Sequence, residues 1–313
     1  MSNNLKIGIV MDPISNIKPQ KDSTLAIMLG AQALGAELFY MEQDDLYIED
    51  DKACGQLRSV KVFDDNEKWY ELGEKQNAPL TNLNYILMRK DPPVDKRFIH
   101  TCYMLEHAAR NGVKVVNNPT ALHRYNEKIF ATHFPEFCPP YQLSSDKEVL
   151  QNFLNKHEKI IIKPLDAMGG QGVFMVKKDD VNFEVIWEMQ TDNGQYPIVA
   201  QAFIPAIDKG DKRIIIIDGE PVDHALVRIP KGGSIRGNLA AGASYEVQPL
   251  NAHEINVAQT VGKRLKQENI IFSGIDMIGD YLIEVNITSP TGLREISNAT
   301  GTDLGKLLME KII

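Results

Sequence analysis

Three oxygen-bearing side chains, Asp276, Glu284 and Asn286, interrupt two apolar segments within residues 272–294. A Gly-Asp pair between the two segments is a strong signal for a β-hairpin. Because an unpaired carboxylate is costly to bury, each acid needs a partner. Two carboxylates and an amide oxygen suit Mg²⁺, which takes few protein ligands and usually keeps waters or phosphates in its shell. The stretch therefore predicts either a magnesium site or a purely structural hairpin.

The length of the hairpin turn separates these two interpretations. With a two-residue turn, Asp276 would lie opposite Ile283 and point away from Glu284. With a three-residue or bulged turn, Asp276 lies opposite Glu284, and all three oxygen ligands share one face of the hairpin. A metal site therefore requires an odd or bulged loop.

A second group of residues suits the binding of phosphate. Lys163 closes an apolar strand, and Gly169, Gly170 and Gly172 follow it directly. Such a loop can present backbone N–H groups and one fixed cation to phosphates. It is not a P-loop, because the Lys-Ser/Thr pair is missing and a strand follows it instead of a helix. The alternative is a glycine turn beside a lysine whose ammonium group reaches solvent.

Two further features follow in the chain, a pair of arginines and a glycine-rich segment. Arg213 and Arg228 lie on the two strands of a predicted hairpin, and arginine binds phosphate or carboxylate through both oxygens. A surface ion-pair network would use the same residues. Residues 230–243 have no periodicity and contain four glycines, which is typical of a mobile lid or of a disordered loop.

The composition argues against several classes of protein. The net charge of −8 does not suit a general nucleic-acid surface, and the three widely spaced cysteines offer neither a disulfide framework nor a zinc pattern. The sequence has no apolar run of the ~18 residues that a membrane span needs, and its start leads directly into a strand. We therefore expect a cytoplasmic protein that binds neither nucleic acid nor membrane.

The first part of the chain alternates strands and helices. Strands are predicted at residues 6–12, 37–41, 85–88 and 113–117, and helices at residues 23–34 and 95–110. This alternation predicts a doubly wound α/β domain over residues 1–122. Its first loop lacks the glycines of a dinucleotide fingerprint, so a Rossmann coenzyme site is not expected.

The rest of the chain is predicted to be α+β. Strands are expected at residues 159–164, 172–177, 197–204, 213–218 and 221–229, besides the hairpin at 272–286. Helices are expected at residues 183–190, 254–267 and 302–311.

Several of these motifs occur together in an unusual order. They are Met11-Asp12-Pro13, Met88-Arg89-Lys90-Asp91-Pro92-Pro93, Asn126-Glu127-Lys128, Lys163-Pro164-Leu165-Asp166, Gly169-Gly170, Gly210-Asp211-Lys212-Arg213, Arg228-Ile229-Pro230, residues 236–242 and Glu284-Val285-Asn286. The combination resembles the ATP-grasp superfamily, and within it the prokaryotic glutathione synthetase family. The resemblance runs nearly end to end. It implies an N-terminal α/β domain over residues 1–122, followed by an α+β ATP-grasp module. That module would consist of a central subdomain, 123–203, and a catalytic subdomain, 204–313, with a lid at 230–243.

The resemblance also implies roles for individual residues. ATP would be bound by Lys128, Lys163, Gly169, Gly170, Gly172 and Asp211, and by the hinge formed by Gln201, Ala202, Phe203 and Ile204. Mg²⁺, or Mn²⁺ in its place, would be held by Asp276, Glu284 and Asn286. The catalytic residues would be Arg213, Arg228, Arg236 and Asn238, and the peptide substrate would meet Arg89, Ser289, Pro290 and Thr291. One departure from the family pattern is Gly292, where a bulkier residue such as cysteine is expected.

The activity that the family implies is the ATP-dependent ligation of γ-glutamylcysteine and glycine, through an acyl phosphate, in a homo-oligomeric enzyme. The residues suit this chemistry, because phosphoryl transfer needs positioning and charge neutralisation more than a protein nucleophile. A lid would protect the acyl phosphate from water. Two alternatives stay open. One is another ATP-grasp carboxylate–amine ligase, acting on D-alanine or on a peptide tail, and the other is a regulatory protein that binds ATP without turnover.

Overall fold

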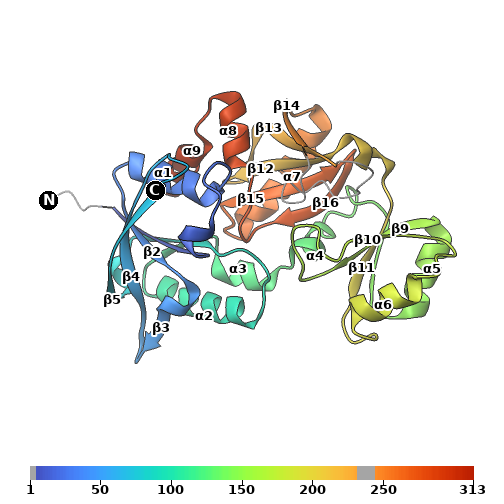
Figure 1. The fold of residues 1–313 in the computed structure, drawn as a ribbon, viewed down its shortest axis with the longest axis horizontal. Helices are drawn as coiled ribbons and strands as arrows, with labels where there is room; N and C mark the ends of the chain where they lie inside the picture. Colours follow the sequence, from blue (N-terminus) through green and yellow to red (C-terminus); the bar gives the residue numbers. More distant parts are fainter. Residues whose placement is uncertain (1–4, 231–243) are drawn as a thin grey trace.

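The computed structural model describes residues 5–230 and 244–313, which form three units along the long axis of the molecule (Figure 1). An α/β unit built from the N-terminal part lies at one end. A small antiparallel sheet with two helices lies at the other end, and a larger antiparallel sheet lies between them. The predicted α/β domain followed by an α+β module is confirmed. The glycine-rich segment 231–243 lies outside the described residues, so the lid stays a prediction.

The sheet of the N-terminal unit is parallel at its centre and antiparallel at one side. Its strand order is β3-β4-β2-β1-β6-β7, and β5 pairs with the outer side of β4. The strands are β1 (Lys6–Met11), β2 (Glu37–Met41), β3 (Leu46–Glu49), β4 (Lys52–Val62), β5 (Tyr70–Pro79), β6 (Tyr85–Arg89) and β7 (Lys114–Val116). The pairs β2–β1, β1–β6 and β6–β7 are parallel, as expected for a doubly wound core.

Helices α1 (Ser23–Ala33) and α2 (Lys96–Arg110) cover opposite faces of this sheet. Successive side chains of a strand point to opposite faces, so neighbouring strand positions contribute to different cores. Ile9 belongs to the core that contains α1, whereas Met88 belongs to the core that contains α2. Asp22 and Asp95 cap these helices by accepting hydrogen bonds from the backbone three residues on.

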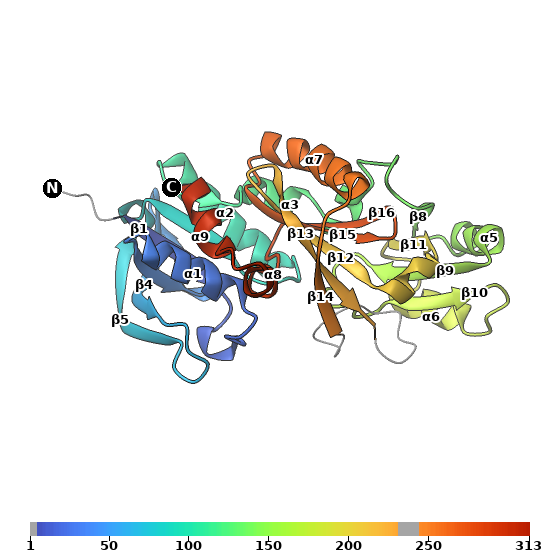
Figure 2. The same cartoon turned by 90° about the horizontal axis from the view of Figure 1, so that it is seen from above.

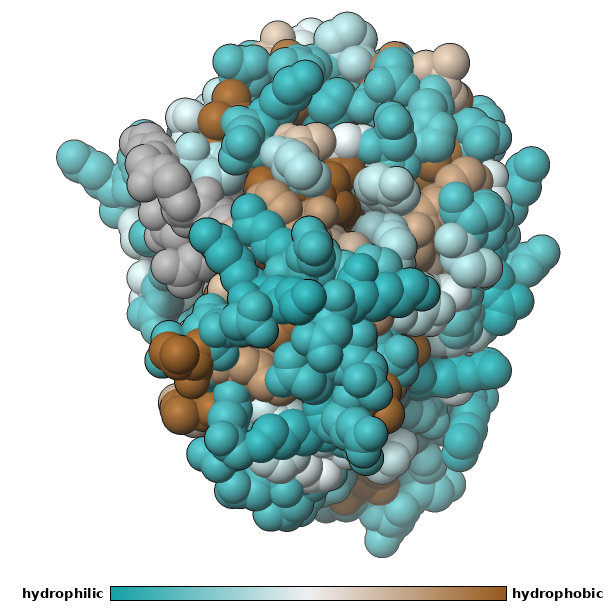
Figure 3. Space-filling model, turned by 90° about the vertical axis from the view of Figure 1, so that its right-hand side faces the viewer, coloured by the Kyte–Doolittle hydropathy of each residue, from teal (hydrophilic) through white to brown (hydrophobic). Residues whose placement is uncertain are grey.

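The small unit has a core of its own. Its sheet has the order β10-β9-β11-β8 and is antiparallel throughout. Its elements are β8 (Tyr141–Ser144), α5 (Lys147–His157), β9 (Lys159–Pro164), β10 (Phe174–Lys177), α6 (Phe183–Thr191) and β11 (Ile198–Ala202). Its outward face is mostly hydrophilic (Figure 3). None of the helices that the structure describes is long and apolar enough to cross a membrane.

The large sheet carries the hairpin that the sequence singled out. Its order is β14-β13-β12-β15-β16, with antiparallel pairing between all neighbours. The strands are β12 (Asp211–Ile217), β13 (Glu220–Ile229), β14 (Ser244–Pro249), β15 (Phe272–Ile278) and β16 (Tyr281–Asn286). Helix α7 (Ala252–Gln267) packs on one face, and α3 (Pro119–Arg124) and α4 (Glu127–Ala131) connect the N-terminal unit to the other units.

The side chain of Asn117 makes several hydrogen bonds between the N-terminal unit and the large sheet. The amide of Asn117 donates to the carbonyls of Phe272 and Ile287 at 2.6 and 2.7 Å, and its oxygen accepts from the N–H groups of Ile271 and Phe272, both at 2.9 Å. Asn117 is 4% exposed. The four hydrogen bonds fix β7 against β15 and the end of β16.

The last two helices, α8 (Leu293–Thr300) and α9 (Leu304–Ile312), run back to the N-terminal unit (Figures 1 and 2). Helix α9 lies against α1 at a close backbone contact, because a Cβ on Gly30 would lie 2.5 Å from the nitrogen of Lys306. A Cβ on Gly305 would lie 2.2 Å from the carbonyl oxygen of Ala26. The predicted domain limits place α9 in the catalytic subdomain, whereas α1, the helix on which it packs, belongs to the N-terminal domain.

The sequence analysis missed some elements, chiefly β5, β8, β14 and α8. Strands β5 and β14 are largely exposed and polar, so they lack the alternation that marks a half-buried strand. Helix α8 has only eight residues and begins at a glycine without a side-chain cap. Short elements of this kind are specified by tertiary contacts more than by local pattern.

Candidate active site

A cavity of about 1000 Å³ lies where the three units meet. The predicted site residues that line it are Lys128, Lys163, Gly169, Gly170, Gln201, Ala202, Phe203, Ile204, Asp211, Arg213, Arg228, Asp276, Glu284, Asn286, Ser289 and Thr291. Three others, Arg89, Gly172 and Pro290, lie outside this lining. Arg236 and Asn238 fall in segment 231–243, outside the described residues. The structure thus brings most of the predicted residues to one cavity.

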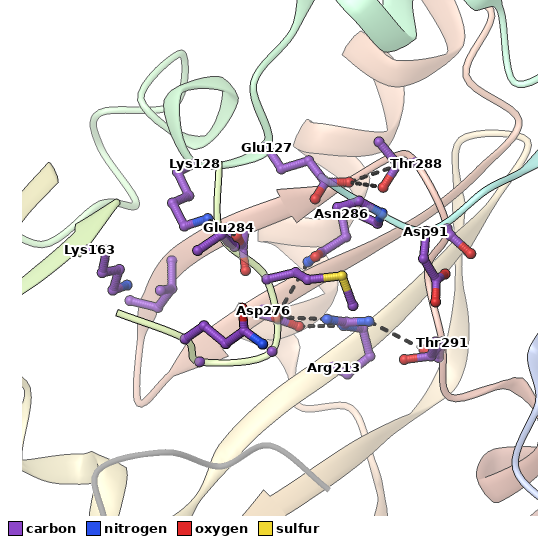
Figure 4. A pocket seen from close by; sticks show the side chains of 18 of the residues that line it. Asp91, Glu127, Lys128, Lys163, Arg213, Asp276, Glu284, Asn286, Thr288 and Thr291 are labelled. Carbon is purple, nitrogen blue, oxygen red and sulfur yellow. Dashed lines mark hydrogen bonds and ion pairs between the residues drawn. The ribbon is translucent and has the colours of Figure 1, made fainter. Parts of the chain in front are cut away.

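Two lysines mark one end of the cavity (Figure 4). Lys163, at the end of β9, donates to Gln201 Oε1 at 2.9 Å, and burial lowers its pKa to about 8. Lys128 donates to the carbonyls of Ala167 at 2.6 Å and Leu165 at 3.3 Å, which lie in the predicted phosphate loop. Both ammonium groups are therefore held in place before any ligand binds.

The glycines of this loop have positive φ angles, a backbone conformation that other residues rarely adopt. Gly169, Gly170 and Gly172 have φ angles of 67°, 77° and 66°. A Cβ on Gly172 would lie 2.9 Å from Pro164 Cγ, so this glycine shapes the loop from outside the cavity.

Two backbone N–H groups of the predicted hinge at residues 201–204 already make hydrogen bonds within the protein. The N–H groups of Ala202 and Phe203 donate to the carbonyls of Pro140 and Lys159 at 2.9 and 3.0 Å.

The hairpin of β15 and β16 has the bulge that a metal site requires. Asp276 lies opposite Glu284, and the register shifts between Asp276 and Met277. The extra residue is Ile283, which turns Asp276 and Glu284 to the same face. Asn286 donates from Nδ2 to Asp276 Oδ2 at 3.3 Å, which leaves its amide oxygen for another partner. The geometric condition for three oxygen ligands on one face is thereby met.

Arg213 and Arg228 form a buried cluster with two aspartates rather than a surface network. Arg213 makes a two-point ion pair with Asp276. Arg228 binds Asp211 through Nε at 3.0 Å and Nη2 at 2.5 Å, and its Nη2 also lies 3.0 Å from Asp276. Burial alone would raise the pKa of Asp276, but the two guanidinium groups hold it well below its usual range.

A glycine makes room for this cluster. Arg213 lies across β15 at Gly274, where a Cβ would be 2.6 Å from Arg213 Cδ. Arg213 also donates from Nη1 to the carbonyl of Thr291 at 3.3 Å. The guanidinium group is therefore fixed between the hairpin of β15 and β16 and the turn that follows it.

Comparison with known proteins identifies the family. The model of the prokaryotic glutathione synthetase N-terminal domain matches residues 5–123, and that of the prokaryotic glutathione synthetase ATP-grasp domain matches residues 127–301. The chain belongs to the prokaryotic glutathione synthetase family. It is accordingly an ATP-dependent ligase.

The relatives match over nearly their whole length. The glutathione synthetase of Pseudomonas putida is 50% identical over 308 residues, which are 98% of this chain and 97% of that protein. The glutathione synthetase of Shewanella oneidensis is 49% identical over 98% of both chains.

Solved structures of other ATP-grasp ligases share the fold. D-cycloserine synthetase DcsG has a TM-score of 0.70 at 11% identity, covering 98% of this chain and 100% of its own. D-alanyl-alanine synthetase A from Vibrio cholerae has a TM-score of 0.64 at 13% identity, covering 100% and 98%. At these identities the likeness concerns the fold alone.

Arg89, a predicted substrate residue of the family, lies behind the cavity wall. It is 5% exposed, donates from Nε to Thr24 Oγ1 at 3.1 Å and from Nη2 to the carbonyl of Pro290 at 3.0 Å. Burial lowers its pKa to about 10. Arg89 therefore braces the turn that carries Ser289 and Thr291.

Gly292 follows the same turn, at the point where the sequence departs from the family pattern. Its φ is +113°, a conformation that side chains rarely adopt, and a Cβ would lie 3.3 Å from Leu226 Cδ2. This backbone favours glycine at position 292.

Glu127 is the clearest residue that the sequence analysis did not select. Its Oε1 accepts hydrogen bonds from Ile287 N at 2.7 Å, and from Thr288 N and Thr288 Oγ1, both at 2.9 Å. Burial and the nearby carboxylate of Glu284 raise its pKa. Glu127 thus links the helix that carries Lys128 to the strand end that carries Asn286. The only sequence signal was its place beside Lys128 in a family motif.

Proposed function

We propose that this enzyme joins γ-glutamylcysteine to glycine and converts ATP to ADP and phosphate. One observation carries the proposal beyond family membership. Buried lysines, a hairpin of hard oxygen ligands and a locked arginine–aspartate cluster line one cavity in the order that phosphoryl transfer to a carboxylate needs.

The lysines would bind the phosphates of ATP. Lys163 and Lys128 are already oriented by Gln201 and by the loop carbonyls, so little side-chain entropy is lost when ATP binds. The positive φ values of Gly169 and Gly170 shape the loop on the same side of the cavity. Gln201, Ala202, Phe203 and Ile204 border the place for the base, and Asp211 lies next to Arg228.

The donor set fits Mg²⁺. Asp276 and Glu284 offer carboxylate oxygens and Asn286 an amide oxygen on one face, and Mg²⁺ can take the rest of its shell from phosphates and waters. Glu284 and the amide oxygen of Asn286 would hold the ion. Asp276 Oδ2 already has three donors around it, so Asp276 would contribute through Oδ1 alone. When bound, Mg²⁺, or Mn²⁺ in its place, would neutralise charge on the phosphates.

The arginines would act on the carboxylate that receives the phosphoryl group. Because Asp276 and Asp211 fix Arg213 and Arg228, their remaining N–H groups point in set directions. Fixed donors stabilise developing charge without reorganisation, which suits the phosphoryl transfer and the tetrahedral intermediate formed when glycine attacks. No protein nucleophile is needed, because the acyl phosphate is formed on the substrate itself.

Several parts of the proposal stay predictions. They are the lid with Arg236 and Asn238, the contacts of Ser289, Pro290 and Thr291 with the peptide, the homo-oligomeric state and the cytoplasmic location. The predicted absence of nucleic-acid and membrane partners also stays a prediction.

The decisive assay is phosphate release from ATP with γ-glutamylcysteine, measured with and without glycine. We expect release that depends on both substrates, with glutathione formed in equal amount. Replacing the pair by D-alanine, or by a peptide ending in glutamate plus a free amino acid, should give only background. Turnover with D-alanine, or ATP binding without turnover of any pair, would contradict the proposal and support one of the two alternatives.

A further inference from the structure

The loop between β1 and α1, residues 12–22, borders the cavity and has little regular structure. It contains one turn of 3-10 helix, η1 (Ile14–Asn16). Pro13, Asn16 and Ile17 line the cavity, whereas Ile14 is 2% exposed and belongs to the core that contains α1. Because most of the loop lies outside helices and strands, contacts from other elements must hold its shape.

Two aromatic side chains from distant parts of the sheet hold the backbone of Ile14. The N–H group of Ile14 donates to Tyr40 Oη at 3.3 Å, and its carbonyl accepts from Trp69 Nε1 at 2.9 Å. Tyr40 belongs to β2, and Trp69 directly precedes β5. Both backbone polar groups of this buried residue are thus satisfied by side chains, which fixes the position of η1.

The hydroxyl of Tyr40 is itself fixed. It donates to Glu42 Oε1 at 2.6 Å, so its oxygen is left to accept from Ile14. Burial and the hydrogen bond to Glu42 raise the pKa of Tyr40, so the hydroxyl keeps its proton at neutral pH. Glu42 in turn caps the short helix η2 (Gln43–Asp45). Tyr40 therefore reaches η1 from a rigid base.

The indole of Trp69 is tied to the helix that follows the loop. Residues 63–69 join β4 to β5, and the N–H group of Phe63 donates to the carbonyl of Trp69 at 2.9 Å. Val62, the last residue of β4, exchanges two hydrogen bonds with the side chain of Gln32 in α1, both at 3.0 Å. The end of β4 thus connects Trp69 to α1, and the loop is held between them.

The loop lies at the end of the cavity away from the proposed ATP site. Asp12, at its start, accepts from the N–H group of Asp91 at 3.0 Å and pairs with Lys90 at 2.9 Å. Figure 4 shows Asp91 beyond Thr291 as seen from Lys163. In the function proposed above, the ligand at this end is the dipeptide.

Resting on that function, we propose that Tyr40 and Trp69 are positioning residues for the dipeptide. Neither side chain lines the cavity, so each acts through the backbone of Ile14. A loop that is already held in shape loses little conformational entropy when a ligand binds. Loosening it weakens binding of the dipeptide and leaves phosphoryl transfer at the other end of the cavity unchanged.

Two conservative variants test the assignment. Trp69→Phe keeps an aromatic ring and removes the donor to Ile14, and Tyr40→Phe removes the acceptor. The KM for γ-glutamylcysteine should rise about 2- to 10-fold in each variant, the effect of one hydrogen bond. The kcat and the KM for ATP should stay at the wild-type values, whereas a purely structural role would change all three together.

The chain provides a matched control. Its other tryptophan, Trp187 in α6, also donates from Nε1 to a backbone carbonyl at 2.9 Å, that of Ser145. Trp187→Phe removes the same kind of hydrogen bond from the small unit. The KM for γ-glutamylcysteine should stay at the wild-type value in this variant.

The control variant also makes the loop observable by fluorescence, because Trp69 is then the sole tryptophan. With a non-hydrolysable ATP analogue bound, adding γ-glutamylcysteine should change the emission of Trp69. Introducing Tyr40→Phe into this variant should raise the dipeptide concentration at half of the change by the same factor as it raises the KM.

The inference is overturned if Trp69→Phe and Tyr40→Phe keep the wild-type KM for γ-glutamylcysteine, or if Trp187→Phe raises it equally. A parallel change in kcat and in the KM for ATP, or emission that does not respond to the dipeptide, would also overturn it. A wild-type enzyme that does not turn over γ-glutamylcysteine with glycine would refute the proposed function itself. The two failures are therefore distinct.

Discussion

The two ends of the cavity carry opposite arrangements of charge. At the phosphate end, Lys163 and Lys128 are held by neutral oxygens of Gln201 and the loop backbone, and Lys128 adds only a long ion pair with Glu284 at 3.4 Å. At the other end, Glu295 Oε2 and the carboxylate of Asp91 have no hydrogen-bond partner among residues 5–230 and 244–313. Between them, Arg213, Arg228, Asp211 and Asp276 neutralise one another. The phosphate end thus carries the charge opposite to that of ATP, the ligand proposed for it, and the arginine–aspartate cluster separates the two ends.

The largest effect is expected from Asp276→Asn, which disrupts the arginine–aspartate cluster. Arg213 would lose its two-point partner and Arg228 one of its two, while both stay buried. Breaking a buried ion pair by removing one partner costs about 3–5 kcal/mol. Urea unfolding should show a loss of this size, and turnover should disappear.

The comparison variant is Asp211→Asn, which leaves Arg228 paired with Asp276 and does not touch Arg213. Its loss of stability should be clearly smaller. Equal losses in the two variants would show that Asp276 is not the centre of the cluster.

Removing a proposed metal ligand should affect activity more than folding. Glu284→Gln keeps the shape of the side chain, and its ion pair with Lys128 is long, at 3.4 Å. Turnover should fall about 100-fold or more, because a bound metal supplies several kcal/mol to the transition state. Unfolding free energy should change by less than ~1 kcal/mol, as for a weak ion pair. Full turnover at saturating Mg²⁺ would remove Glu284 from the metal site.

Glu127 tests how the phosphate end is positioned. Glu127→Ala would leave the N–H groups of Ile287 and Thr288 without their acceptor and should cost about 1–3 kcal/mol for each group left buried and unpaired. Glu127→Gln keeps an acceptor oxygen and should cost less. The KM for ATP should rise in the alanine variant more than in the glutamine variant. If both variants have the unfolding free energy and the KM for ATP of the wild type, Glu127 has no positioning role.

The smallest effect is a pH dependence at the lysine end. Burial lowers the pKa of Lys163 to about 8, so its ammonium loses its proton as the pH rises through that value in the free enzyme. Phosphate needs the charged form, so kcat/KM for ATP should decline above pH ~8, by at most about tenfold per pH unit. Lys163→Arg should flatten this limb, because guanidinium stays protonated. A decline of the same size in that variant would assign the limb to another group.

The sequence predicted the chemistry of the phosphate end better than that of the far end. Glycines, lysines and hard oxygen ligands occur in short, ordered motifs. The sequence named a bulged turn as the condition for Asp276 and Glu284 to share a face, and the structure has that bulge at Ile283. The other end of the cavity, which is lined by Lys21, Asp91 and Glu295, has no such motif, because these residues lie on three separate segments. Only the packing of α8 against α1 brings them together, and α8 itself was not predicted.

The role of Arg89 shows a second limit of sequence analysis. A motif identifies the residue type that a site needs nearby, but it does not show which way the side chain points. Arg89 points into the protein, where Thr24 and Pro290 accept its hydrogen bonds. Burial of this kind is a property of the assembled units.

The central claim is that the phosphoryl group passes to the dipeptide's cysteinyl carboxylate before glycine attacks. The most direct test uses γ-glutamylcysteine with an isotopic oxygen label in that carboxylate, and follows the label by mass spectrometry of the released phosphate. Attack of the carboxylate on ATP, followed by displacement of phosphate by glycine, predicts that each phosphate carries one oxygen from the substrate. Phosphate without label, in the presence of full glutathione formation, would contradict the acyl phosphate route.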